Sequence, residues 1–369
     1  MEIQAAVLRA ANEPLTIETL TIDNPLDNEV LVRTVASGVC HSDLHIYEGI
    51  VFGGRMPMVL GHEGAGVVEA VGANVTHVSP GDHVVTCLSG FCGRCEQCLG
   101  GHPNVCTANP TARPRGSAPR LSAGDEKVQG FINIGGFAEK MLVHENSLVR
   151  IEPDIPLDVA CLVGCGVLTG VGAALRTAAV RAGETVAVFG CGGVGLSIIQ
   201  GAAIAGAGQI IAVDRVPAKL ELARSLGATH VVDVSAVDDP VSAVRELTGG
   251  SGVNHAFEAV GVPALVTQAA MSLAVRGTCT IVGVPPDGAV FEIPYAAIRP
   301  ECTIQTCRMG SNRFRTDIPR YLEFNKQGRL HLDELISGRP GLEGVNDAFA
   351  ALQAGTGART VLTFGDPVT

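Results

Sequence analysis

The sequence predicts an α/β protein in which a doubly wound parallel sheet domain is joined to a second, β-rich domain. The length of 369 residues suits two domains rather than one. Short apolar runs separated by turn signals fill roughly the first 160 residues. From about Cys165 onward, strand-like and helical segments alternate, which is typical of a parallel sheet covered by helices.

The N-terminal part is expected to be mainly strands. Turns such as Asn24-Pro25 and Pro80-Gly81-Asp82 separate the apolar runs. These runs cover residues 5–8, 29–36, 64–71, 83–87 and 137–143. Residues 107–136 form a polar insert with Arg113, Arg115, Arg120 and several Pro and Gly. We expect a long loop there, whose length suggests a functional or oligomer role.

The C-terminal half carries the alternating pattern. The strand-like runs are residues 185–189, 210–213, 230–234, 253–259 and 278–284, and the helical ones are 194–205, 217–226, 241–247 and 264–274. We therefore expect a nucleotide-binding domain over residues 167–308. Residues 1–166 and 309–369 would form the β-rich domain, with a strand at 360–364 returning to it.

Charge and hydropathy exclude some classes of protein. With 26 Lys+Arg against 37 Asp+Glu, the formal charge of −11 argues against nucleic acid or an anionic membrane surface as the main partner. Residues 185–213 contain no charged side chain and imitate a membrane span. Seven glycines interrupt this stretch and Asp214 follows it, so a buried strand–helix–strand unit is favoured. The first ten residues lack a signal-peptide core, and twelve cysteines then indicate a reducing compartment, the cytoplasm.

Four cysteines within fifteen residues predict a metal site. They follow the pattern C-x2-C-x2-C-x7-C in a glycine-rich loop and are Cys92, Cys95, Cys98 and Cys106. Four thiolates close a tetrahedral shell around zinc and leave no position for a substrate. This cluster is therefore expected to be structural, and the chemistry must lie elsewhere.

A glycine-rich turn predicts a dinucleotide site. The motif G-x-G-x-x-G follows the strand-like run and opens a helix, and its residues are Gly190, Gly192, Gly193, Val194 and Gly195. A pyrophosphate would rest on the amide groups of the helix N-terminus. Asp214 follows nineteen residues after Gly195, at the end of the next strand. A carboxylate there accepts the ribose 2′-hydroxyl and favours NAD over NADP, although the neighbouring Arg215 weakens that preference.

A second, open metal site would supply catalysis. The remaining soft ligands are Cys40, His41, His45, His62, Cys161 and Cys165. A catalytic zinc needs about three protein ligands and one open position, and two thiolates with one imidazole, as from Cys40, His62 and Cys165, would provide them. Spacing alone does not choose Cys165 over Cys161 or His62 over His41, and buried inert thiols are the alternative.

Together these motifs resemble the zinc-dependent medium-chain alcohol dehydrogenases over nearly the whole chain. The resemblance rests on Gly61-His62-Glu63, the four-cysteine loop, Cys40 with Ser42 and His45, and the glycine motif with Asp214, in that family's order. It implies a GroES-like catalytic domain, a Rossmann NAD-binding domain, two zinc ions per chain and NAD. It also implies that NAD takes a hydride from an alcohol to give an aldehyde, reversibly.

The resemblance also implies roles for individual residues. Cys40, His62 and Cys165 would hold the catalytic zinc, with Glu63 as an occasional ligand and Asp43 orienting His62. Ser42 would contact the substrate hydroxyl and His45 would pass its proton to solvent. Lys219 would contact the adenosine ribose and Arg359 the pyrophosphate. His41 stands where many relatives carry an arginine, so its contact with the pyrophosphate would be weaker and pH-dependent.

The substrate is the least determined part. A primary alcohol is expected, with aromatic and allylic alcohols as candidates. One alternative is oxidation of S-hydroxymethyl thiols, but that branch of the family uses an acid near residues 50–54, which have none, and an arginine that Arg113 and Arg115 do not match in position. A second alternative is a nicotinoprotein that keeps its NAD bound, and a third is a non-catalytic NAD-binding protein with one structural zinc. Relatives pair through the sheet edge that corresponds to residues 302–308, so a homodimer or homotetramer is expected.

Overall fold

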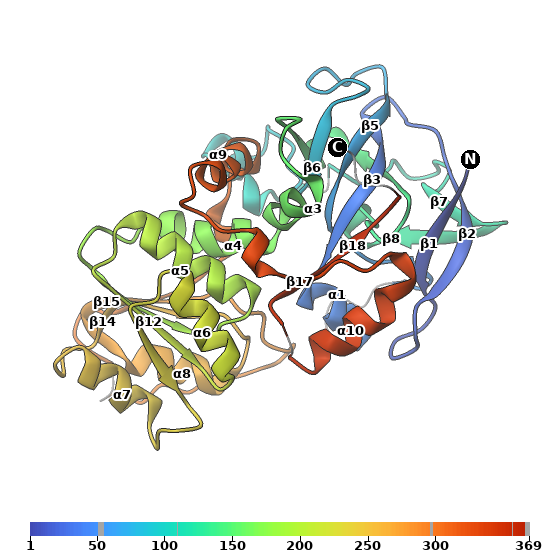
Figure 1. Cartoon of the computed structure of the whole chain (residues 1–369). Helices are drawn as coiled ribbons and strands as arrows, with labels where there is room; N and C mark the ends of the chain where they lie inside the picture. The colour runs from blue at the N-terminus through green and yellow to red at the C-terminus, as the bar shows by residue number, and fades with distance from the viewer. Residues whose placement is uncertain (51–54, 109, 296–297, 356, 366–369) are drawn as a thin grey trace. The chain divides into compact units, whose positions relative to one another are not determined.

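The computed structural model describes residues 1–50, 55–108, 110–295, 298–355 and 357–365 (Figure 1). It divides into two compact units. One comprises Met1–Cys165, Arg313–Glu323 and Leu332–Thr369, and the other Gly166–Asn312 and Phe324–His331. The second unit thus contains Gly166 and residues 309–312 and 324–331, whereas the expected division placed them in the β-rich domain. Two hydrogen bonds hold residues 324–331 to the second unit, from Gln200 Nε2 to His331 O and from His331 N to Gln200 Oε1.

The first unit is built from two β-structures. A closed barrel has the order β1 (Glu2–Leu8), β2 (Thr16–Ile22), β7 (Leu121–Ala123), β8 (Glu126–Gly130) and β4 (Met58–Val59). The other sheet has the order β10 (Leu148–Ile151), β6 (His83–Thr86), β5 (Glu63–Val71), β3 (Glu29–Val39), β18 (Arg359–Thr363) and β17 (Ile336–Gly338), and β9 (Lys140–His144) also pairs with β3. The pairing of β18 with β3 confirms the expected return of the last strand.

The barrel corrects one expectation. Residues 107–136 are not wholly a loop, because they contain β7 and β8, an antiparallel pair in which Leu121 faces Val128. Leu121 and Val128 are both buried and belong to the same apolar core as strand β1. Their apolar side chains anchor the hairpin in the barrel, and the polar residues between them hide this pattern in the sequence.

The second unit is the expected parallel sheet. Its order is β13 (His230–Asp233), β12 (Gln209–Asp214), β11 (Thr185–Phe189), β14 (Val253–Glu258), β15 (Leu273–Ile281) and β16 (Thr303–Thr306), and every adjacent pair is parallel. The chain thus winds from β11 to one side and then to the other, the order of dinucleotide-binding sheets. Helices α5 (Gly193–Ala205), α6 (Pro217–Ser225), α7 (Pro240–Leu247) and α8 (Pro263–Met271) connect the strands (Figure 1).

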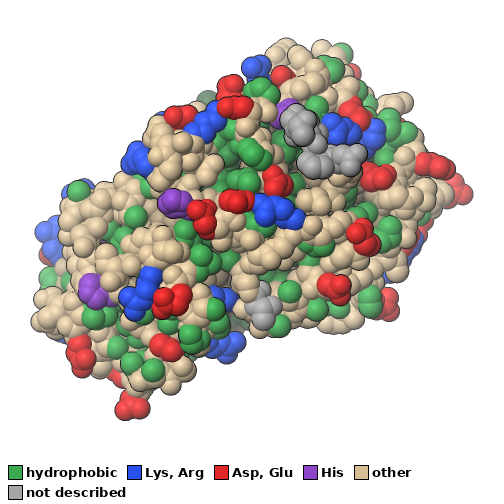
Figure 2. Space-filling model, in the orientation of Figure 1, with side chains coloured by type: hydrophobic (Ala, Val, Ile, Leu, Met, Phe, Trp, Pro, Cys, Tyr) green, Lys and Arg blue, Asp and Glu red, His purple; other side chains and the backbone are tan. Residues whose placement is uncertain are grey.

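The apolar segments of the second unit confirm one expectation and correct another. Residues 185–213 form β11, α5 and β12, which confirms a strand–helix–strand unit. Helix α8 ends at Met271 and β15 begins at Leu273, so the helix predicted over 264–274 is three residues too long at its C-terminal end. Among the described residues, no single helix is long and apolar enough to cross a membrane, although Leu157–Gly164 and Gly166–Thr177 pass together by length and composition. On the face shown in Figure 2, acidic and basic side chains are interspersed.

Candidate metal centres and nucleotide site

The proposed catalytic ligands come from three points of the first unit where the chain changes direction. Cys40 lies between β3 and helix α1 (His41–Tyr47). His62 precedes β5 and follows Gly61, whose φ of +87° and contact with Phe137 exclude a side chain, since a Cβ there would lie 2.5 Å from the Phe137 ring. Cys165 directly follows the short helix Cys161–Gly164.

These three turns bring a compact donor set together. The ligand atoms of Cys40, His62, Glu63 and Cys165 all lie within 4.8 Å of one another, and all four residues are buried. Cys161 is not a member of this group, because its Sγ donates instead to Asp158 O at 3.2 Å. His41 is exposed on α1 and is not a member either. Spacing left both choices open, and the geometry favours Cys165 and His62.

The donor set fits zinc. His62 is fully buried, yet its Nε2 has no hydrogen-bond partner among the described residues. A buried imidazole nitrogen rarely lacks a partner unless it binds something else. Its other nitrogen, Nδ1, lies 3.2 Å from Asp43 Oδ1, so Nε2 is the atom left for a ligand. One imidazole and two thiols are a set that zinc prefers.

Asp43 is the centre of this arrangement. It is fully buried, and its carboxylate accepts the backbone N–H groups of Cys40 at 3.1 Å and Gly61 at 2.9 Å in addition to its contact with His62. The Asp43 side chain therefore positions the backbone of Cys40, the backbone of Gly61 directly before His62, and the ring of His62. The contact of Asp43 with His62 is the one that the family resemblance implied.

Buried charges shift the pKa values of this cluster. A hydrogen bond from Cys165 holds the pKa of Cys40 well below its usual range, and the same bond, together with burial, raises the pKa of Cys165. Burial lowers the pKa of His62, but the Asp43 carboxylate and the Cys40 sulfur together outweigh it and the net pKa is raised. Burial raises the pKa of Glu63 to about 7, although Arg359 opposes that shift. One thiol is thus already disposed to be a thiolate, the form that binds a metal.

Arg359 occupies a place that the sequence did not indicate. It is 6% exposed, its Nη1 lies 3.3 Å from Glu63 Oε1, and it also reaches Val39 O at 3.5 Å. The guanidinium is therefore a buried counter-charge for Glu63 and for the thiols beside it, whatever contact it makes with a cofactor.

The predicted proton-transfer residues both lie on α1. Ser42 Oγ is 4.0 Å from Cys40 Sγ, and Ser42 is half-buried. His45, three residues further along the helix, is also half-buried. The described residues show no hydrogen bond between the two side chains, but residues three apart share a face of a helix.

Sequence reasoning missed Phe131. Its ring meets the His62 ring edge to face, with centroids 5.4 Å apart and planes at 81°. It belongs to the turn Phe131–Asn133, in which Ile132 has a φ of +50°. No local signal identifies such a residue, because sixty-nine positions separate it from His62.

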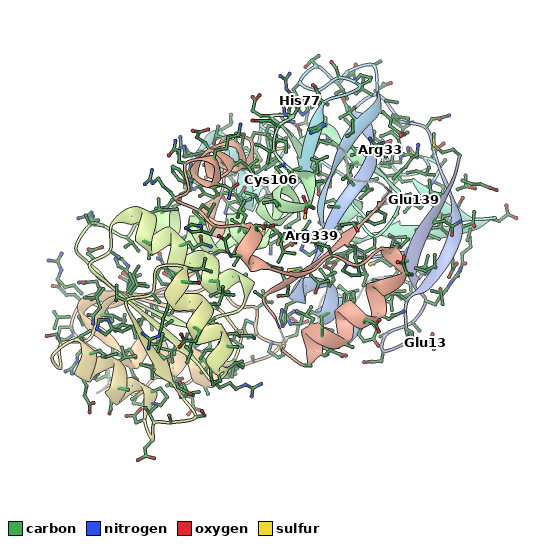
Figure 3. The ribbon with its side chains drawn as sticks, viewed as in Figure 1. Glu13, Arg33, His77, Cys106, Glu139 and Arg339 are labelled. Carbon is green, nitrogen blue, oxygen red and sulfur yellow. The ribbon has the colours of Figure 1, made fainter. Side chains whose placement is uncertain are left out.

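The four-cysteine loop forms the second cluster. The sulfur atoms of Cys92, Cys95, Cys98 and Cys106 lie within 4.8 Å of one another, and no described cysteine is in a disulfide (Cys106 is labelled in Figure 3). Backbone N–H groups of Arg94 and Cys95 donate to Cys92 Sγ, and that of Cys92 donates to Cys106 Sγ. The N–H groups of Cys98 and Thr107 lower the pKa of Cys95 to about 5. Four sulfurs at this spacing fit a closed zinc site.

The glycine motif lies where β11 meets α5 in the second unit. Gly190 has a φ of +98°, and a Cβ on Gly195 would lie 1.8 Å from Gly190 O, so neither position admits a side chain easily. A Cβ on Gly192 would meet nothing within 4 Å. The backbone at Gly192 is therefore open to a ligand, as a pyrophosphate requires.

Asp214 ends β12 beside this turn. Its Oδ2 accepts the Cys191 N–H at 2.7 Å and its Oδ1 accepts the Val216 N–H at 2.9 Å. Arg215 is exposed, and Lys219 is half-buried in the first turn of α6. Gly193 and Val194 begin α5. The expected NAD residues of this unit thus surround one turn, and His41 and Arg359 belong to the other unit.

A further acid near this turn was also missed. Glu258 ends β14, is fully buried, and accepts the N–H groups of Val260 and Gly261 at 2.8 and 2.7 Å. A Cβ on Gly190 would lie 2.3 Å from Val260 Cγ2, so Glu258 shapes the loop against the glycine turn. An acid at the end of the strand next to β11 was the available signal.

Comparison with known proteins agrees with this geometry. Residues 26–153 match the family model described as alcohol dehydrogenase GroES-like domain, and residues 193–326 match the one described as zinc-binding dehydrogenase. An NDMA-dependent alcohol dehydrogenase of Amycolatopsis methanolica is 39% identical over 98% of this chain and 99% of its own length. An S-(hydroxymethyl)glutathione dehydrogenase of Haemophilus influenzae is 37% identical over 98% of this chain and 97% of its own.

Solved structures agree as well. An alcohol dehydrogenase zinc-binding domain protein from Burkholderia ambifaria has a TM-score of 0.94 and 40% identity, and covers 99% of this chain and 100% of its own. The benzyl alcohol dehydrogenase of Acinetobacter calcoaceticus has a TM-score of 0.91 and 33% identity, with the same coverage. The Cys/His/Glu cluster and these relatives support zinc and NAD as the cofactors. The chain therefore belongs to the zinc-dependent medium-chain alcohol dehydrogenases and is an NAD-dependent enzyme of that family.

Proposed function

We propose that this enzyme oxidises primary alcohols to aldehydes reversibly, with aromatic and allylic alcohols as its preferred substrates. The unpartnered Nε2 of His62, between two thiols in a buried cluster, carries the proposal, because it marks an incomplete coordination shell. The 33% identity to a benzyl alcohol dehydrogenase over nearly the whole chain supports the aromatic preference.

The chain's own residues divide the work of the reaction. Cys40, His62 and Cys165 would hold the zinc, and the Asp43 carboxylate keeps the ring of His62 oriented so that Nε2 faces the thiols. Bound zinc supplies a Lewis acid that lowers the pKa of an alcohol, and NAD accepts the hydride. Ser42 would receive the alcohol proton at Oγ, and His45 would exchange a proton with solvent.

Glu63 and Arg359 would adjust the cluster. Glu63 lies within ligand distance of the other donors, so it can occupy the fourth position when no substrate is present. Arg359 holds Glu63 Oε1 at 3.3 Å and so favours its withdrawal from the cluster. The four cysteines of the loop would bind a second, structural zinc.

A steady-state assay tests the proposal. Enzyme, NAD and a panel of primary, secondary, aromatic and S-hydroxymethyl thiol substrates are mixed, and NADH absorbance is followed. Benzyl and allyl alcohols should give the highest kcat/KM. Highest activity with S-(hydroxymethyl)glutathione would instead establish the thiol-adduct reaction. Residues 50–54 contain no acid for that reaction, and residues 51–54 lie outside the described part of the chain.

The name of the relative from Amycolatopsis methanolica favours a second candidate. In it NAD stays bound and electrons pass to an added acceptor. Repeating the same panel with NDMA as the added acceptor separates the two candidates. Turnover only with NDMA, with NAD still bound after gel filtration, would show that free NAD is not the oxidant. In either case Cys40→Ser should abolish turnover while NAD binding persists. Metal analysis of the wild-type enzyme is a separate test: one zinc per chain rather than two would favour a non-catalytic NAD-binding protein.

We also propose that the enzyme forms homodimers or homotetramers in the cytoplasm. Strand β16 is the last strand of the parallel sheet, and Thr303, Ile304 and Thr306 are exposed on it, which leaves an edge that a second copy can extend. All twelve cysteines are free, as expected in a reducing compartment. Sedimentation equilibrium tests the assembly, and a monomer at micromolar concentration would contradict it.

A further inference from the structure

The polar insert encloses a cavity that the proposed reaction does not use. Residues 112–121 line it together with parts of β8 and β9, and its volume is about 300 Å³. This is at the lower end of the range for small-molecule sites. It belongs entirely to the first unit, and none of the four residues of the proposed catalytic cluster lines it.

The lining of this cavity is cationic. It includes Arg113, Arg115, Arg120, Lys127 and Lys140, and no aspartate or glutamate is among the described lining residues. The whole chain has a formal charge of −11, so a cavity whose charged lining residues are all positive is unusual in it. A concave surface with one sign of charge attracts small ions of the other sign.

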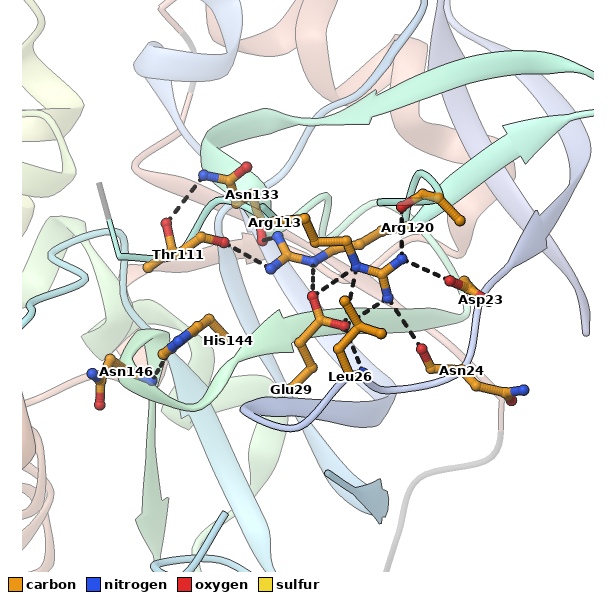
Figure 4. A network of polar contacts seen from close by, with 11 residues as sticks. Asp23, Asn24, Leu26, Glu29, Thr111, Arg113, Arg120, Asn133, His144 and Asn146 are labelled. Carbon is orange, nitrogen blue, oxygen red and sulfur yellow. Dashed lines mark hydrogen bonds and ion pairs between the residues drawn. The ribbon is translucent and has the colours of Figure 1, made fainter. Parts of the chain in front are cut away.

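Three of these cations are already neutralised from behind the wall. Glu29 Oε2 accepts Arg113 Nη2 at 2.6 Å, Glu29 Oε1 accepts Arg120 Nε at 2.7 Å, and Asp23 accepts Arg113 Nη1 at 2.7 Å (Figure 4). Lys140 pairs with Glu69. These carboxylates balance three of the five positive charges.

The other two cations are uncompensated. Arg115 and Lys127 are exposed, and the side chain of neither makes a hydrogen bond or an ion pair with a described residue. They lie on two sides of the insert, one before β7 and one within β8. An occupant carrying two negative charges would balance them.

Hydrogen bonds fix the positions of two arginines in the wall. The side chains of Arg113 and Arg120 are 8% and 13% exposed, and their further bonds reach Ala118 O, Thr111 O and Asn133 O. Asn133 also lines the cavity and has a φ of +58°, next to Ile132 at +50°. Left-handed backbone at a β-branched residue costs energy and tends to persist at functional sites.

We propose that this cavity binds a small organic dianion, a dicarboxylate or a phosphate monoester, at a site separate from the alcohol site. Arg115 and Lys127 hold the two negative charges, and Arg113 and Arg120, which pair with Glu29 and Asp23, form the polar wall beside them. An uncharged alcohol gains nothing from such a lining.

Isothermal titration of the enzyme loaded with zinc and NAD tests the proposal, with succinate and methyl phosphate as the two dianions and acetate at equal ionic strength as the monoanion. Loading with NAD and zinc keeps the probes from those sites. Saturable binding of at least one dianion is expected, and it should weaken at least about tenfold in Arg115→Gln and in Lys127→Gln, because each loses a charge-assisted hydrogen bond.

Arg320→Gln is the matched control, since Arg320 is exposed in the same unit and does not line the cavity. Its affinity should equal that of the wild type. The dianion that binds better identifies the ligand as a carboxylate or a phosphate compound. No saturable binding of either dianion, or equal affinity in the wild type and in Arg115→Gln and Lys127→Gln, would overturn the proposal, and alcohol turnover would be unaffected by that result.

Discussion

Replacing Asp43 by Asn should loosen the catalytic zinc selectively. The carboxylate accepts three hydrogen bonds, from Cys40 N, Gly61 N and His62 Nδ1, without contact with solvent. An amide can present only one oxygen, so its NH2 group must face at least one of these donors. The loss of one charge-assisted bond costs about 1.5–3 kcal/mol, or about 10- to 150-fold in affinity. This agrees with the roughly 10- to 100-fold typical of residues that orient metal ligands.

Chelator competition measures this effect. Zinc release to a colorimetric chelator should show two classes of site in the wild type, and Asp43→Asn should weaken one class by about 10- to 100-fold and leave the other unchanged. Glu258→Gln is the control, because Glu258 is an equally buried carboxylate that accepts backbone N–H groups in the other unit. Two results would contradict this role of Asp43 in orienting His62. One is that Asp43→Asn releases zinc from both classes of site at the same chelator concentrations as the wild type. The other is that Glu258→Gln weakens zinc binding as much as Asp43→Asn does.

Three further changes test other parts of the molecule. Asp214→Ser should raise the kcat/KM with NADP relative to NAD, since it removes the carboxylate that repels a 2′-phosphate; an unchanged ratio would deny Asp214 that role. Cys95→Ala should lose one zinc and lower the Tm before it lowers activity, and a fully folded variant without hydride transfer would contradict a structural role for the loop. Glu29→Gln should destabilise the fold by about 3–5 kcal/mol at pH 7, because Arg120 loses its carboxylate partner and Arg113 keeps only Asp23. Burial alone would raise the pKa of Glu29, but Arg113 and Arg120 lower it to about 2 from an ordinary value of 4.5. The contribution of Glu29 to the free energy of unfolding is therefore complete above pH 4.5 and is lost as the pH falls toward 2. The stability difference between wild type and Glu29→Gln should shrink by about 1 kcal/mol at pH 4, and a difference in urea unfolding that stays constant with pH would refute the pairing.

The parallel sheet was predictable because its signals are local. Strands β11 and β12 each contain an apolar run of four residues, and the glycine motif directly follows β11 and leads into α5. The four-cysteine loop was predictable for the same reason, since its ligands lie within fifteen residues. The hairpin β7–β8 was not, because strands of three and five residues between polar turns carry too few apolar positions.

The catalytic ligands needed the tertiary structure. Cys161 and Cys165 lie four residues apart and are equally buried, so composition and spacing treat them alike. The short helix between them decides the matter, because it turns the Cys161 thiol toward Asp158 O and leaves Cys165 at its end beside Cys40 and His62. Phe131 and Arg359 reach the cluster across sixty-nine and almost three hundred residues, and no periodicity records such contacts.

Charge balance explains why this cluster can stay open while the loop cluster closes. In the loop, four sulfurs share one site, and backbone N–H groups of the loop itself stabilise their negative charge. In the proposed catalytic cluster only two thiols take part, and as thiolates they would offset the charge of a bound zinc without a further anion. Glu63 is the carboxylate that could close this shell, and Arg359 holds it from the other side at 3.3 Å. We therefore expect Arg359 to favour an arrangement in which Glu63 stays off a bound zinc and the fourth position remains available.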